Sequence, residues 1–143
     1  MATIRHSIDI DGEASRVWNA VADLSDYASW NPFLVEGRGD LVPDRRLRLR
    51  MQLGTRQMTF APTVQEVDEG RRVRWLGRLG IPGIFDGEHV LEVEPIGDGR
   101  ARFTQEEQFR GVLVPFMRSL LRNTDEGFRA MNEALKTRVE SAA

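Results

Sequence analysis

The chain has 143 residues, 22 acidic against 20 basic side chains, and no cysteine. A chain of this length buries a substantial core without disulfides or metal ions, so we expect a single domain over residues 1–143. The absence of cysteine excludes thiolate metal sites and thiol nucleophiles. Because the charges nearly balance and the basic residues are scattered, we expect no nucleic-acid partner.

The sequence also gives no sign of a membrane segment, a metal site or a cofactor. The N-terminus lacks an apolar segment of signal-peptide length, and no run of about 18 apolar residues occurs, so we expect a cytoplasmic protein without stable membrane insertion. His6 and His89 are the only histidines. With two histidines, no cysteine and no HExxH-type spacing, we expect no metal and no cofactor. His6 is interpreted as a satisfied core residue.

The first part of the sequence predicts a strand followed by two short helices. Apolar and polar residues alternate over residues 4–10, as in a strand with one buried face. Apolar residues recur at helical spacing over 12–24 and predict a short amphipathic helix. A second helical piece over 25–30 ends before Pro32.

The middle of the sequence predicts antiparallel strands. Alternation with a period of two recurs over 45–53, 58–69, 71–79, 85–95 and 102–109, and glycine-containing turns separate most of these segments. One phase is apolar, and the other is charged, which indicates a face in contact with water. On that face we expect cross-strand ion pairs for Arg46, Arg48, Arg50, Arg72, Arg74 and Arg78.

The last third changes period and predicts one long helix. From Pro115 to about Glu140, apolar residues recur every three or four positions. Gly127 interrupts the pattern; it either permits the close approach of a bulky group or allows a slight bend. Because the apolar face of the sheet must be covered, and a strongly curved sheet rarely closes tightly on a helix, we expect a cavity between them.

Three stretches carry a resemblance to a known superfamily. They are IDIDGEASRVWNAVADLSDYASWNPF, FDGEHVLEVEP and FTQEEQFRGVLVPFMRSLLRNTDEGFRAMNEALKTRVE. With the predicted order of elements, the chain resembles the START-like (SRPBCC) superfamily, specifically its polyketide cyclase/dehydrase and lipid-transport group. The resemblance implies an α+β helix-grip fold, in which a curved antiparallel sheet of six to seven strands wraps around the C-terminal helix. It also implies a ligand cavity between sheet and helix, and it implies no particular reaction.

The inward phases of these elements supply a set of candidate ligand-binding residues. Their mixture of methionine and aromatic side chains suits an adaptable apolar site with few polar anchors. The resemblance places Trp30 and Phe33 near the base or entrance of the cavity. The full set is Trp30, Phe33, Met51, Met58, Phe60, Trp75, Leu79, Phe85, His89, Gln105, Glu107, Phe116, Leu120, Thr124 and Phe128.

Glu107 and His89 are the candidates for chemistry. Both fall in apolar strand phases, and burial should raise the pKa of Glu107 unless a cation pairs with it. His89 or Arg71 is the expected partner, although a β-bulge would turn Glu106 inward instead. Thr124 would bond either a ligand or the helix carbonyl one turn earlier.

Three functions are compatible with this sequence, and the oligomeric state stays open. We favour a protein that binds, carries or senses a small hydrophobic or aromatic molecule. A cyclase- or dehydratase-like enzyme would need at least two polar groups that converge inside the cavity. A protein-interaction module would show a filled core and an exposed apolar patch. In the first two cases, the loop 80–83 is expected to act as a lid beside residues 116–120.

Overall fold

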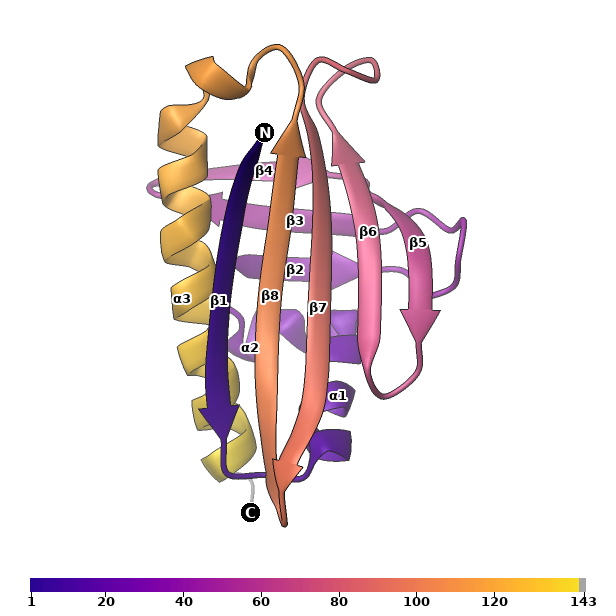
Figure 1. Cartoon of the computed structure of the whole chain (residues 1–143), viewed down its shortest axis with the longest axis vertical. Helices are drawn as coiled ribbons and strands as arrows, with labels where there is room; N and C mark the ends of the chain where they lie inside the picture. The colour runs from indigo at the N-terminus through magenta and orange to yellow at the C-terminus, as the bar shows by residue number, and fades with distance from the viewer. Residues whose placement is uncertain (142–143) are drawn as a thin grey trace.

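A computed structural model of the protein, described over residues 1–141, contains two antiparallel sheets and a long C-terminal helix (Figure 1). The predicted α+β helix-grip architecture is confirmed. The elements in chain order are β1 (Ala2–Ile10), α1 (Ala14–Ala22), η1 (Leu24–Asp26), α2 (Tyr27–Trp30), β2 (Leu34–Arg38), β3 (Arg48–Leu53), β4 (Arg56–Phe60), β5 (Thr63–Asp68), β6 (Arg72–Arg78), β7 (Asp86–Gly97), β8 (Arg100–Arg110), η2 (Val114–Phe116) and α3 (Arg118–Ser141).

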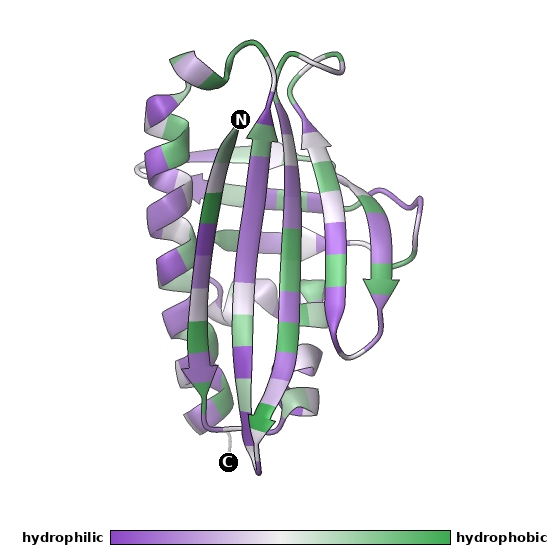
Figure 2. Cartoon of the chain, viewed as in Figure 1, coloured by the Kyte–Doolittle hydropathy of each residue, from purple (hydrophilic) through white to green (hydrophobic). Residues whose placement is uncertain are grey.

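The larger sheet has the strand order β1-β8-β7-β6-β5, and the smaller one has the order β2-β3-β4. Figure 1 shows the small sheet running crosswise behind the large one, with α3 alongside β1. Helix α3 contacts both β1 and β3, so it lies between the two sheets. Polar and apolar bands alternate along the strands of the large sheet (Figure 2), as the period-two pattern predicted.

The predicted number of six to seven strands in one sheet was wrong: residues 1–141 form eight strands in two sheets. The sequence pattern treated 58–69 as one strand, but the chain breaks at Pro62 into β4 and β5. Proline has no N–H to donate to a strand ladder, which explains the break. Strand β2 was not predicted, because its five residues include Gly37 and show no clean alternation.

The long helix begins three residues later than predicted. Val114–Phe116 form a 3₁₀ turn, and α3 starts at Arg118. Pro115 lies in that turn, where its missing N–H leaves no hydrogen bond unmade. The helix then buries one stripe of side chains, which comprises Thr124, Phe128, Met131, Asn132, Leu135 and Val139.

His6 is not a core residue, contrary to the prediction. It lies on the edge strand β1, where its side chain is one-fifth exposed, and its Nε2 is 2.7 Å from Oδ1 of Asp125 on α3. Because β1 has no neighbouring strand on this side, the inward phase of the strand reaches the surface of the helix rather than the core. The pair therefore joins β1 to α3 at the margin of the fold.

The outer-face arginines form cross-strand ion pairs, as predicted for most of them. Each pair is at least partly exposed and therefore contributes no more than ~1 kcal/mol. Arg46 and Arg48 have no carboxylate within ion-pair distance in the part of the chain described here. The observed nitrogen–oxygen distances are 3.1 Å for Arg50–Glu36, 3.5 Å for Arg78–Asp86, 3.6 Å for Arg72–Glu92 and 3.7 Å for Arg74–Glu66.

Gly127 allows an aromatic ring to pack directly on the α3 backbone. A Cβ at this position would overlap the ring of Phe33, which follows α2. The Phe33 ring also meets the Phe128 ring edge-on, with 5.6 Å between their centroids. The glycine is therefore a close-approach position, which was one of the two interpretations that the sequence left open.

The substitution Gly127→Ala tests this contact. Alanine is favoured over glycine in a helix by about 1 kcal/mol, but the added methyl group would force the Phe33 ring out of its place. We expect the free energy of unfolding, measured by urea denaturation, to fall by about 1–3 kcal/mol. Adding Phe33→Leu to this variant should recover part of the loss. A net gain in stability from Gly127→Ala alone would contradict the packing.

Candidate functional site

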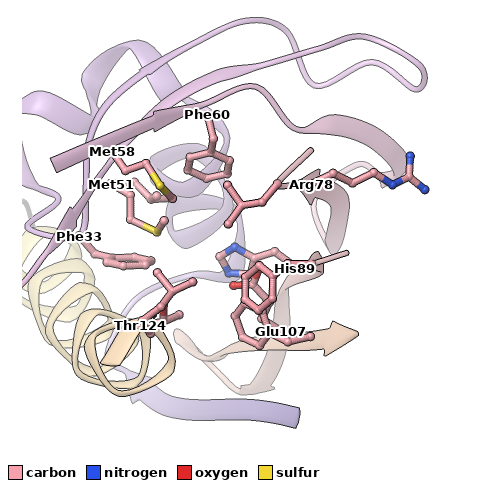
Figure 3. A pocket seen from close by; sticks show the side chains of 15 residues that line it. Phe33, Met51, Met58, Phe60, Arg78, His89, Glu107 and Thr124 are labelled. Atoms are coloured by element: carbon pink, nitrogen blue, oxygen red, sulfur yellow. Dashed lines mark hydrogen bonds between the residues drawn. The ribbon is translucent and has the colours of Figure 1, made fainter. Parts of the chain in front are cut away.

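A cavity lies between the two sheets and the N-terminal half of α3 (Figure 3). Its walls are mostly apolar, with methionine and phenylalanine side chains from β3, β4, β8 and the segments that precede β2 and β7. Its position between sheet and helix is the one that the sequence predicted. The lining residues are Phe33, Leu34, Met51, Met58, Phe60, Gly77, Arg78, Leu79, Phe85, Gly87, His89, Glu107, Phe109, Leu120 and Thr124.

The cavity is small in this structure, with a volume of about 60 Å³. That volume holds a few water molecules, whereas pockets for drug-sized ligands have roughly 300–1,000 Å³. The side chains of Met51, Met58 and Phe60 are only partly buried. Methionine has three rotatable bonds and adapts its shape easily. A ligand of more than a few atoms therefore requires these side chains to rearrange.

Most residues predicted to line the cavity do so, and the exceptions fall into two groups. Trp30 packs edge-on against Tyr27, with 5.6 Å between ring centroids, and is not one of the residues that line the cavity. Phe116 is 80% exposed, because it lies in the 3₁₀ turn before α3 rather than in the helix stripe. Trp75, Gln105 and Phe128 are buried in the layer behind the lining residues.

Several lining residues were missed by sequence reasoning. Gly77 and Gly87 are strand glycines, a signal that often marks the close approach of another group. A Cβ on Gly77 would lie 3.5 Å from the Phe60 ring, and one on Gly87 would overlap the Glu107 carboxyl group. Arg78 contributes the base of its side chain, while its guanidinium group extends away from the cavity in Figure 3.

His89 sits at the floor of the cavity between two aromatic rings. Its imidazole stacks on Phe128 at a centroid distance of 4.8 Å and meets Trp75 edge-on at 5.2 Å. Burial lowers the pKa of His89 to about 4, against a smaller opposing effect of its hydrogen bond with Gln105. The imidazole is therefore neutral at pH 7.

The contacts of the buried Gln105 amide indicate which nitrogen of His89 carries the proton. Nε2 of Gln105 donates to Oδ1 of Asn132 at 2.8 Å and lies 3.5 Å from the carbonyl oxygen of Phe128. Oε1 of Gln105 therefore faces His89 and accepts from its Nε2 at 3.0 Å. With the proton on Nε2, Nδ1 is a hydrogen-bond acceptor that has no partner within residues 1–141.

Glu107 lies directly opposite His89 in the β7–β8 ladder and faces the cavity. Neither His89 nor Arg71 pairs with it, so the predicted partner was wrong: His89 bonds Gln105, and Glu107 has no side-chain partner in the described part of the chain. Glu106 faces outward, where its Oε2 is 3.0 Å from Arg5. Burial alone raises the pKa of Glu107 to about 8, so the carboxyl group is mostly protonated at pH 7.

Thr124 lies on the helix side of the cavity. Its hydroxyl donates to the carbonyl oxygen of Leu120 at 2.8 Å, which is the bond to the preceding turn that the sequence offered as one alternative. The hydroxyl oxygen keeps its own acceptor capacity. The cavity thus presents one protonated carboxyl group as a donor and two neutral acceptors within an apolar wall.

Two further findings concern metal ions and membrane-spanning helices. Within residues 1–141, no three histidine, aspartate or glutamate side chains gather closely enough to hold a metal ion. No helix in the same range is both long and apolar enough to cross a membrane.

Comparison with known proteins gives the family. Residues 1–140 match the model of the family described as polyketide cyclase/dehydrase and lipid transport. The chain belongs to this family. A search of curated protein sequences found none that matches.

Solved structures with similar folds include START-domain and aromatase/cyclase proteins. A START superfamily protein from Mycobacterium smegmatis is 18% identical, with 99% of each chain covered and a TM-score of 0.75. The ZhuI aromatase/cyclase from Streptomyces sp. R1128 is 14% identical, with 97% of this chain and 93% of that chain covered and a TM-score of 0.80. The di-domain aromatase/cyclase BexL of the BE-7585A biosynthetic pathway is 22% identical, with 98% and 47% covered and a TM-score of 0.76. At these identities the likeness shows the fold.

The raised pKa of Glu107 predicts how the free energy of unfolding changes with pH. The folded state holds the Glu107 proton up to a pKa of about 8, whereas the unfolded chain releases it near 4.5. The native protein therefore loses stability as pH rises from about 4.5 to 8. Glu107→Gln cannot ionise, so its stability relative to the wild type should grow over this range, by on the order of 2–4 kcal/mol.

Urea denaturation at a series of pH values measures this difference. Glu106→Gln is the matched control, because it changes the neighbouring residue on the outer face and should give no growing advantage between pH 5 and 8. Equal pH profiles for the wild type and Glu107→Gln would contradict the assignment of Glu107 to the cavity.

Proposed function

We propose that this protein binds a small, electrically neutral, mostly apolar molecule in the cavity between its sheets and α3. The apolar lining supplies the binding free energy by burying the ligand surface. The observation that carries the proposal is the carboxyl group of Glu107, which lies in this lining and has no side-chain partner within residues 1–141. Such a group is costly to bury unless something hydrogen-bonds to it, and a ligand would supply that bond.

The charges around the cavity set the class of ligand. The guanidinium group of Arg78 pairs with Asp86 at 3.5 Å outside, and both interior titratable groups are neutral at pH 7. An anionic ligand would find no cationic group inside the cavity among the described lining residues, and Glu107 would repel it whenever that group is ionised. A neutral molecule with a carbonyl or hydroxyl group fits better, because either group can accept from Glu107, and a hydroxyl group can also donate to Nδ1 of His89.

A second candidate function is acid–base catalysis of the cyclase or dehydratase kind. It is favoured by one observation: two polar groups, His89 and Glu107, face each other across adjacent strands in the same cavity. Glu107 has the right protonation state for a general acid at pH 7. His89, with a pKa of about 4, is a weak base. Binding is therefore the primary proposal, because it needs no proton abstraction.

Titration with a neutral aromatic probe tests ligand binding directly. On addition of 2-naphthol, the methyl signals of Met51 and Met58 should shift in ¹H–¹³C spectra, because both side chains line the cavity. The buried Met131 belongs to the core at the other half of α3 and should stay unchanged. The anion 2-naphthoate, which has the same ring system, should bind at least about tenfold more weakly at pH 7.

A pair of variants on one helix provides the control. Leu120→Trp fills the cavity and should abolish the 2-naphthol shifts, whereas Leu121→Trp adds the same bulk beside it, outside the lining. Shifts that persist in Leu120→Trp, or that appear equally at Met131, would place the probe elsewhere and contradict the proposal.

The catalytic candidate is tested by turnover. If the protein cyclises or dehydrates a polyketide-like substrate, Glu107→Gln should lower the rate by about 10²–10⁴-fold while leaving the probe-induced shifts in place. Unchanged turnover in that variant would remove Glu107 from the reaction and leave the binding function alone.

A further inference from the structure

Two loops place exposed apolar side chains at one end of the molecule. Ile81, in the loop between β6 and β7, is 68% exposed; Val112 and Phe116, in the connection from β8 to α3, are 66% and 80% exposed. Leu113 is also exposed. Both loops lie at the top of the view in Figure 2, where much of the β8–α3 connection is coloured hydrophobic. We call these four residues the apolar end.

The two loops are held together by the backbone. N–H of Val112 donates to the carbonyl of Gly83 at 3.1 Å, and N–H of Leu113 donates to the carbonyl of Ile84 at 3.1 Å. Gly111 has a φ of 128°, and a Cβ there would overlap the Ile84 backbone, so only glycine permits this contact. The apolar end is therefore one joined surface rather than two independent loops.

Arginines without acidic partners accompany this surface. Between residues 109 and 122 the sequence contains Arg110, Arg118 and Arg122 and no acidic residue. All three are exposed, and within residues 1–141 none has a carboxylate at ion-pair distance. Arg118 and Arg122 are four residues apart and therefore share one face of α3. The nearby Asp86 is already paired with Arg78 at 3.5 Å.

We propose that the apolar end is a docking surface for an anionic lipid bilayer. Exposed Ile, Val, Leu and Phe side chains enter the boundary between headgroups and acyl chains, and the arginines contact lipid phosphates. A protein interface would also bury these apolar residues, but unpaired arginines around a small protruding tip match the negative charge and the shape of a membrane surface more closely.

The apolar end lies next to the cavity, so docking to a bilayer would bring the cavity close to the membrane. Leu79 and Phe85 flank the first loop, Phe109 and Leu120 flank the second, and all four line the cavity. A molecule docked by its apolar end would hold this side of the cavity against the bilayer, where apolar molecules dissolve. Docking itself does not depend on the proposed ligand, and the two can fail separately.

Vesicle flotation with the full-length protein tests the proposal. The wild type should float with vesicles of phosphatidylcholine containing about 30 mol% phosphatidylglycerol and should stay at the bottom with pure phosphatidylcholine. The double variants Ile81→Ser/Phe116→Ser and Arg118→Glu/Arg122→Glu should each reduce flotation at least tenfold. The matched controls are Val42→Ser and Arg38→Glu. They change an exposed apolar residue and an exposed arginine at or just after the C-terminal end of β2, and both variants should float like the wild type.

A label reports which part of the molecule meets the lipid. Because the chain has no cysteine, Phe116→Cys and Val42→Cys each accept a single polarity-sensitive fluorophore. Anionic vesicles should shift the emission to shorter wavelengths for position 116 only.

Three results would overturn the proposal: no flotation of the wild type, equal flotation with neutral vesicles, or a dimer in solution that Ile81→Ser/Phe116→Ser converts to a monomer. The last would make the apolar end an interface between copies of this chain. All variants should keep the methyl signals that Met51, Met58 and Met131 give in the ligand-free wild type, which shows that they fold without relying on the ligand proposal.

Discussion

The hydrogen bonds of the Gln105 amide fix helix α3 against the large sheet, and the site depends on that position. Gln105 is fully buried on β8 and bonds Asn132 on α3 and His89 on β7. Because the one buried amide of Gln105 contacts Asn132, the Phe128 carbonyl and His89, a shift of the helix along the sheet would break several hydrogen bonds at once. Beyond this point α3 closes the core with Met131, Leu135 and Val139; before it, Leu120 and Thr124 border a cavity.

The same arrangement explains the unusual protonation states in the cavity. Burial keeps the imidazole of His89 neutral, and its single N–H donates to Oε1 of Gln105, so it has no proton to offer to Glu107. Gly87 leaves room for the Glu107 carboxyl group, and no cation within residues 1–141 pairs with it. A carboxylic acid in an apolar wall then stays protonated and becomes a hydrogen-bond donor near neutral pH. A site of this kind selects for neutral ligands rather than for charged ones.

The sequence predicted the fold well, because the arrangement of strands and helices follows from the periodicity of apolar residues. Period-two alternation placed His89 and Glu107 on the inner face, and helical spacing found the α3 stripe. The hydrogen-bond partner of His89 could not be predicted, because it depends on where α3 lies across the sheet. No local sequence pattern shows that Gln105, rather than Glu107, would bond His89. Pro62 could have indicated the strand break, but apolar and polar residues alternate on both sides of it, so the two strands were interpreted as one. Phe116 was expected in the first turn of the long helix because the helix was predicted to begin at Pro115, and spacing does not reveal that Val114–Phe116 form a 3₁₀ turn.

The most direct test of this account is a ¹³C titration of the Glu107 carboxyl carbon, with and without a bound neutral ligand. We predict a midpoint near pH 8 in the free protein, because burial without a partner raises the pKa to that value. A neutral ligand that accepts a hydrogen bond from the protonated acid should move the midpoint higher, by linkage. A midpoint near 4.5, or one that saturating 2-naphthol leaves unchanged, would contradict the role assigned to Glu107 in the cavity.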